Sequence, residues 1–235
     1  MRKMLKQLFK KQRKCVLIDI NTQKDYFLAD GKALIRNHRR VLSRIRRIMA
    51  WARVKNVPVI STCEVYPRDH HSVDYCIAGT DGQKKIRYSL LDNRTTFPAD
   101  GSTDLPADIL RERKQVIFYK RCLDPFDEPR IERLLTEIKA GVFIVIGACA
   151  EGAVASTVIG LLQRGKNVSV VVDAIGSRYK REAKLALRKM QAKGAKLIET
   201  RKLAGSSHLQ FVGICHCEMC RRNTKKSPPA LATSY

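Results

Sequence analysis

Short apolar runs rich in β-branched residues alternate along this chain with longer segments of helical periodicity. Runs of this kind are typical of strands buried on both faces of a sheet. The predicted strands cover residues 15–21, 57–62, 116–120, 142–146, 168–172 and 196–198, and the predicted helices cover residues 33–55, 131–138, 151–162 and 180–193. This alternation predicts an α/β fold, a three-layer α/β/α sandwich around a mainly parallel sheet of about six strands.

The segment from residue 142 to residue 157 is the most informative of these βα units. Gly147 allows the chain to leave the strand sharply, and Glu151 is placed in the first turn of the helix that follows. The first turn of a helix presents unpaired backbone N–H groups, and ligands of open α/β sheets bind at this edge. The pattern therefore indicates a candidate site, with a plain strand–helix turn as the alternative.

Polar residues end three of the predicted strands. Asp19 ends the first strand and Lys120 ends the third, which places both at the edge where such sheets bind ligands. The alternative for Asp19 is a structural cap of the next turn. Glu64, His70 and His71 follow the second strand and are candidate metal ligands, although adjacent histidines point apart and at most one would serve.

Composition excludes several classes of protein. The chain has 235 residues, 44% of them hydrophobic, which is enough for a full core and too much for a disordered protein. It lacks an apolar run of the ~20 residues that a membrane span needs. The first fourteen residues lack the apolar centre of a secretory signal. The eight cysteines are scattered, which indicates reduced thiols and a cytoplasmic protein.

The formal net charge of +24 favours polyanions or anionic surfaces as partners. Two segments could carry such binding, and for each an ordinary solvated surface is the alternative. Residues 1–14 hold seven Lys and Arg and no acid, as in a basic amphipathic tail or a targeting peptide. The helix predicted at 33–55 carries a row of arginines, which we take as a candidate nucleic-acid surface: Arg36, Arg39, Arg40, Arg44, Arg46 and Arg47.

Taken together, the strand ends and turns resemble those of the isochorismatase-like, or cysteine hydrolase, superfamily, which includes nicotinamidases and true isochorismatases. The resemblance covers residues 15–203. The motifs that carry it are Leu17-Ile18-Asp19, Gly79-Thr80-Asp81-Gly82, Lys120 with Asp124-Pro125-Phe126, the stretch from Gly147 to Val154, Arg164-Gly165 and Asp173-Ala174.

One position departs from the family. The resemblance places Asp19 and Lys120 in the family's catalytic triad, but Ala153 occupies the position of the nucleophilic cysteine. It also implies an oxyanion hole formed by the backbone N–H groups of Cys149 and Ala153, and a cis peptide bond between Ala148 and Cys149. The Cys149 thiol, four residues earlier, is the alternative nucleophile, although its side chain leaves the chain from a different backbone point.

True isochorismatases cleave a vinyl ether without a cysteine, so the family allows a route that needs no thiol. The resemblance thus implies a small-molecule hydrolase that acts on a vinyl ether or an amide-type bond through Asp19 and Lys120, with no required cofactor. The alternative is a catalytically silent member that binds a polyanion or a protein partner. Family members often form homo-oligomers, and this sequence leaves the number of subunits open.

Two segments bear on metal binding. Nicotinamidases bind a metal through Asp-x-His-Pro-x-x-His, and here Tyr66 replaces the first His of that pattern, which argues against a family-type site. Residues 204–235 form a Cys-rich basic tail, similar over a dozen residues to a zinc motif of the glutathione-dependent formaldehyde-activating family. Its candidate zinc ligands are Cys215, His216, Cys217 and Cys220, with a reduced, metal-free tail as the alternative.

Overall fold

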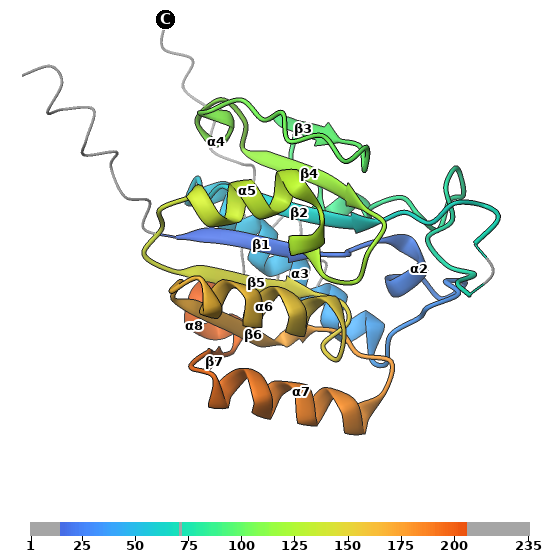
Figure 1. Cartoon of the computed structure of the whole chain (residues 1–235). Coiled ribbons are helices and arrows are strands. Elements are labelled where there is room, and N and C mark those ends of the chain that lie inside the picture. Colours follow the sequence, from blue (N-terminus) through green and yellow to red (C-terminus); the bar gives the residue numbers. More distant parts are fainter. Residues whose placement is uncertain (1–14, 71, 206–235) are drawn as a thin grey trace, which may run out of the picture.

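Seven strands form a single sheet in which all neighbouring strands are parallel (Figure 1). The computed structural model describes residues 15–70 and 72–205. The strands are β1 (Val16–Ile20), β2 (Val59–Glu64), β3 (Arg94–Phe97), β4 (Gln115–Lys120), β5 (Phe143–Gly147), β6 (Val168–Ile175) and β7 (Lys196–Ile198). Their order, β3-β4-β2-β1-β5-β6-β7, places β1 at the centre.

The predicted fold class is confirmed, but the strand number was too low by one. The missing strand, β3, lies between residues 74 and 108, where no strand was predicted. Its four side chains alternate between exposed and half-buried. An edge strand of this kind carries no apolar run, so the pattern used for the other strands could not reveal it.

Helices cover both faces of the sheet. They are α2 (Lys24–Phe27), α3 (His38–Val54), α4 (Ile109–Glu112), α5 (Pro129–Glu137), α6 (Ala153–Gln163), α7 (Lys180–Ala192) and α8 (Thr200–Ala204), with 3-10 turns η1 (Arg87–Ser89) and η2 (Pro125–Asp127). Buried residues of α5, α6 and α7 share one hydrophobic cluster, and those of α3 belong to a second cluster on the opposite face. No helix among the described residues is long and apolar enough to span a membrane.

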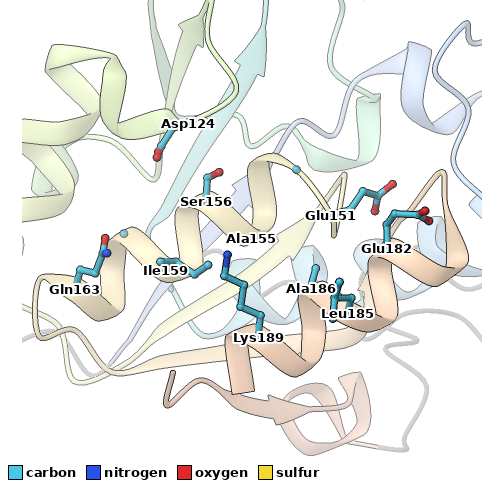
Figure 2. A pocket seen from close by; sticks show the side chains of 12 residues that line it. Asp124, Glu151, Ala155, Ser156, Ile159, Gln163, Glu182, Leu185, Ala186 and Lys189 are labelled. Carbon is cyan, nitrogen blue, oxygen red and sulfur yellow. The ribbon is translucent and has the colours of Figure 1, made fainter. Parts of the chain in front are cut away.

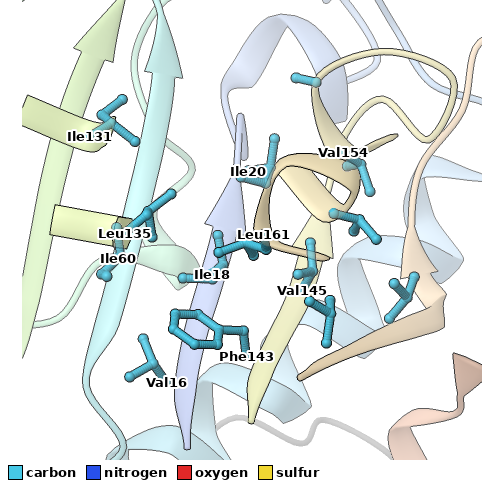
Figure 3. Packing of buried hydrophobic residues seen from close by; sticks show 14 of the residues in the cluster. Val16, Ile18, Ile20, Ile60, Ile131, Leu135, Phe143, Val145, Val154 and Leu161 are labelled. Carbon is cyan, nitrogen blue, oxygen red and sulfur yellow. The ribbon is translucent and has the colours of Figure 1, made fainter. Parts of the chain in front are cut away.

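Strand β1 supplies both clusters because successive side chains of a strand point to opposite faces. Val16, Ile18 and Ile20 pack with α5 and α6, as Figure 3 shows, whereas Leu17 packs on the side of α3. All of these side chains are fully buried. Each buried side chain of this size contributes roughly 1.5–3 kcal/mol to the free energy of unfolding, so β1 contributes strongly to the stability of the fold.

Two predicted helix starts need correction. The helix predicted at 33–55 begins at His38, and Ala33 and Ile35 are buried in the loop before it. Because both residues are apolar, they extend the apolar periodicity of the helix toward the N-terminus and make the helix look longer than it is. Helix α6 begins at Ala153, so Glu151 lies in the preceding turn rather than in the helix. There its carboxylate Oε1 accepts the backbone N–H groups of Arg178 and Tyr179, at 2.9 and 3.2 Å.

Candidate active site

Asp19 lies at the carboxyl end of the central strand β1 and is completely buried. The register aligns it with Ser61 of β2, whose hydroxyl donates to Asp19 Oδ2 at 2.9 Å. The Thr22 hydroxyl also donates to Oδ2, at 3.1 Å. The second oxygen, Oδ1, is buried and accepts no hydrogen bond from the described residues. An unpartnered buried carboxylate oxygen costs free energy, so it marks a place where a ligand or water would bind.

The cation beside Asp19 is Lys85, which sequence reasoning missed. Its ammonium group lies 2.8 Å from Asp19 Oδ2 and 2.6 Å from the Thr22 hydroxyl. The Lys85 side chain is 4% exposed, so this is a buried ion pair. Lys85 belongs to the segment 74–108 and has no periodic pattern around it; the only available signal was its place three residues after the Gly79–Gly82 motif.

Lys120, the lysine expected to act with Asp19, pairs with Glu64 instead. Its ammonium group lies 3.0 Å from Glu64 Oε1 and donates to the carbonyl oxygens of Cys122 and Leu123, at 2.6 and 3.2 Å. Strand β2 separates the strands that carry Asp19 and Lys120. The structure thus holds two buried carboxylate–lysine pairs side by side.

Cys63 lies on β2, the strand between those that carry Asp19 and Lys120. The charges of both lysines and both carboxylates act on its thiol. Burial raises the pKa of this fully buried thiol to about 11, so it is protonated at neutral pH. A protonated thiol is a poor nucleophile, and Cys63 does not supply the one that the family position lacks.

The turn before α6 presents the two expected backbone donors. The N–H groups of Cys149 and Ala153 donate no hydrogen bond to any described residue, although their neighbours Ala150 and Val154 do. The cis peptide bond between Ala148 and Cys149 is present. Two free N–H groups beside a helix N-terminus can stabilise an oxyanion, the charge that develops when a nucleophile attacks a carbonyl or phosphoryl group.

Neither residue of this turn supplies a thiolate. Ala153 is buried and ends in a methyl group. Burial and the carboxylates of Glu151 and Glu64 raise the pKa of the Cys149 thiol well above its usual range. Cys149 therefore remains a thiol at neutral pH, and a catalytic role for its sulfur finds no support in its surroundings.

Glu64 does not fit a metal site. Its Oε1 accepts Asn21 Nδ2 at 2.7 Å in addition to Lys120, and its Oε2 accepts the Tyr26 hydroxyl. Tyr26 and Tyr66 both lie edge-on to Tyr75, and His70 lies against the Tyr66 ring. Within residues 15–70 and 72–205, no group of three or more His, Cys, Asp or Glu side chains could hold a metal ion. Tyrosines and an ammonium group thus surround the carboxylate that would ligate a metal.

Other candidates lie outside the described residues or have internal contacts. His71, the tail 1–14 and the zinc candidates Cys215, His216, Cys217 and Cys220 are not described. Three arginines of the predicted row contact the protein: Arg44 pairs with Asp173, Arg46 lies over the ring of Tyr88, and Arg47 donates to the Gly205 carbonyl. The other three, Arg36, Arg39 and Arg40, are exposed.

A groove of about 430 Å³ lies between α6 and α7, away from Asp19 (Figure 2). Asp124, Glu151 and Glu182 contribute carboxylates to its lining, and Ile159 and Leu185 contribute apolar surface. It contains none of the four charged residues around Cys63. The candidate active site is the buried network at the strand ends, and this groove is a separate surface feature.

The parallel seven-stranded sheet with helices on both faces is the fold of isochorismatase-type hydrolases. The family model of the isochorismatase domain matches residues 15–202, and the chain belongs to this family. No curated protein sequence matches it.

Solved structures of similar fold include three informative cases. The pyrazinamidase of Pyrococcus horikoshii in complex with zinc and the nicotinamidase of Bacillus subtilis are each 18% identical, with TM-scores of 0.63 and 0.64. They cover 79% of this chain and 99% of their own. The MAR1 ribonuclease of Caenorhabditis elegans is 22% identical with a TM-score of 0.57, and the match covers 95% of this chain and 96% of that one. At these identities the similarity shows the fold.

Proposed function

We propose that this protein is a hydrolase that acts by acid–base catalysis at Asp19, without a cysteine nucleophile. The observation that carries the proposal is the buried Asp19 carboxylate, which has three donors on Oδ2 and none among the described residues on Oδ1. Three donors orient the group, and the remaining oxygen is available to a water molecule or a substrate hydroxyl. Zinc enters no step, because Glu64 is already occupied.

The contacts of Asp19 favour a role as the base. The Lys85 ammonium group lies 2.8 Å from Oδ2, so Oδ1 is the oxygen left to accept a proton. Its Oδ1 would take a proton from water as the water oxygen attacks the substrate carbonyl, and the N–H groups of Cys149 and Ala153 would stabilise the oxyanion. The C–N or C–O bond would then break, and Asp19 would pass its proton to the leaving group. A reaction that begins with proton abstraction from water suits an amide-type or ester bond better than a vinyl ether, because a vinyl ether must first be protonated.

The test is turnover by wild type and by Asp19→Asn on nicotinamide, isochorismate and a panel of small amides and esters. Loss of a general base lowers turnover roughly 10²–10⁴-fold, and we expect Asp19→Asn to lie in this range. The matched control is Asp92→Asn, since Asp92 is exposed. Wild-type turnover that survives in folded Asp19→Asn would contradict the proposal.

A second candidate substrate is RNA. Two observations favour it, the net charge of +24 and the match to the ribonuclease MAR1, which covers more of this chain than the amidase matches do. The same base could remove the proton of a 2′-hydroxyl, whose oxygen then attacks the adjacent phosphorus atom. The bond from phosphorus to the 5′-oxygen of the next nucleotide would break, leaving a 2′,3′-cyclic phosphate, and the departing 5′-oxygen would take a proton from water. Incubation of a labelled single-stranded RNA with wild type and Asp19→Asn tests this candidate, and an intact RNA in the presence of wild type would exclude it.

A further inference from the structure

Helix α7 exposes a strongly basic face. Its exposed cations are Lys180, Arg181, Lys184, Arg188 and Lys189, against one exposed acid, Glu182. Among the described residues, none of the five forms an ion pair with an acid. Lys180, Lys184 and Arg188 are four residues apart, so they form one row along the helix with a rise of about 6 Å between neighbours. In the arginine row predicted at 33–55, by contrast, Arg44, Arg46 and Arg47 already contact protein groups.

The basic row begins beside the candidate active site. Figure 1 shows the first turn of α7 at the same edge of the sheet as the carboxyl ends of the strands. Just before the helix, the Arg178 guanidinium lies 5.6 Å from the ring centroids of both Tyr179 and Tyr75. Tyr75 in turn contacts Tyr26, whose hydroxyl donates to Glu64. Rings and a guanidinium thus connect the basic helix with the buried network.

One ring of this series is open to solvent. Tyr179 is 55% exposed, and its backbone is held by the Glu151 carboxylate. A fixed, exposed aromatic ring beside a guanidinium is a surface on which an unpaired nucleobase can stack, and neighbouring cations can bind its phosphates. Duplex bases are already stacked on one another, so a duplex would leave this ring unused.

We infer that α7 and the Arg178–Tyr179 turn bind single-stranded RNA and guide it toward Asp19. The phosphates contact the row Lys180, Lys184 and Arg188, and a base stacks on Tyr179. This inference rests on RNA as the proposed substrate, since it describes how that substrate reaches the same site. It also moves the nucleic-acid surface from α3, where the sequence pattern placed it, to the opposite face of the sheet.

Fluorescence anisotropy with a labelled 20-nucleotide RNA of mixed A and U tests the inference in the full-length protein across a salt series. Replacement of Lys180, Lys184 and Arg188 by Gln should weaken binding about tenfold or more. It should also reduce the slope of log K against log salt by about 2, since each phosphate contact on a single strand contributes about 0.7. Tyr179→Ala should weaken binding about tenfold with little change in slope, because stacking contributes roughly 1–3 kcal/mol per base.

The matched control replaces three exposed cations just before β4, which lies near the other end of the strand order from β7. Arg111, Arg113 and Lys114 are each changed to Gln. This control should bind RNA within about twofold of wild type. Equal losses in the control and the α7 variant would overturn the inference in favour of nonspecific attraction. If only the replacement of Arg39 and Arg40 by Gln weakened RNA binding, the result would overturn the inference and place the RNA surface on α3.

Two further outcomes separate this inference from the proposed hydrolase. Turnover of a small substrate without RNA binding would overturn the RNA-binding surface and support catalysis at Asp19. RNA binding through α7 without hydrolysis of any substrate would overturn catalysis at Asp19 and support the RNA-binding surface. Anionic phosphatidylserine vesicles form the last arm, and α7-dependent binding to them that exceeds binding to RNA would overturn RNA as the ligand.

Discussion

Each of the two carboxylates in the site has its own lysine, and only one of these four residues could not be anticipated. Asp19 and Lys120 end buried strands, and Glu64 follows the same rule, so strand periodicity places them at one edge. Lys85 comes from an irregular segment in which Lys84 has the same chemistry, and nothing local distinguishes the two. The structure distinguishes them, because Lys85 is buried against Asp19 while Lys84 is exposed. Which lysine pairs with Asp19 depends on how the chain folds over the sheet, and the local sequence does not contain that information.

The pair Lys84 and Lys85 allows a direct test at the scale of one residue. Lys85→Met should lower kcat at least about tenfold, because Asp19 and the Thr22 hydroxyl would lose the ammonium group that holds them in place. Lys84→Met, which removes an exposed amine, should leave kcat unchanged. Steady-state kinetics of both folded variants would provide the comparison, and equal kcat values in the two variants would argue against a role for Lys85 in the reaction.

At the scale of elements, apolar runs predicted six of the seven strands, and their order along the chain predicted the alternation with helices. Elements whose signal was not apolar were missed or displaced. Strand β3 has no buried face, and the start of α3 was blurred by Ala33 and Ile35, which are buried but not helical. The same limit applies to the turn before α6, where a sharp bend rather than a periodic pattern decides the path of the chain.

Gly147 makes that bend, with φ of +121°. A Cβ atom at this position would lie 1.9 Å from the Ile20 carbonyl oxygen of the neighbouring strand. Gly147→Ala should therefore reduce the free energy of unfolding by at least about 3 kcal/mol. Gly165→Ala is the matched control, since Gly165 also has positive φ but open space around it, and it should cost about 1 kcal/mol. Urea unfolding would measure both, and equal losses would contradict the steric explanation.

At the scale of the whole molecule, each of the five cysteines in the described part of the chain is buried or half-buried. Burial is the first cause of the raised pKa of Cys15, Cys63, Cys76, Cys122 and Cys149. The sequence correctly indicated thiols without disulfides for these five, which are free. It could not indicate their depth, because depth depends on which faces of the sheet the helices cover.

This burial predicts how stability depends on pH. Above the ordinary thiol pKa of 9.0, the unfolded chain releases protons that the native state retains, up to about pH 11 for Cys63. The free energy of unfolding should thus fall as pH rises above 9, by up to ~1.4 kcal/mol per pH unit for each such thiol. Urea midpoints at pH 8 and pH 10, under reducing conditions, should fall less in Cys63→Ala than in wild type. Parallel declines would show that Cys63 does not contribute.

The buried pair of Lys85 and Asp19 has one more consequence. Lys85 belongs to the irregular segment between β2 and β3, whereas Asp19 belongs to the centre of the sheet, so their ion pair fastens this segment to the core. A displacement of Lys85 would leave the buried Asp19 carboxylate without its cation. Movement of this segment and a change in the charge around the carboxylate are then a single event.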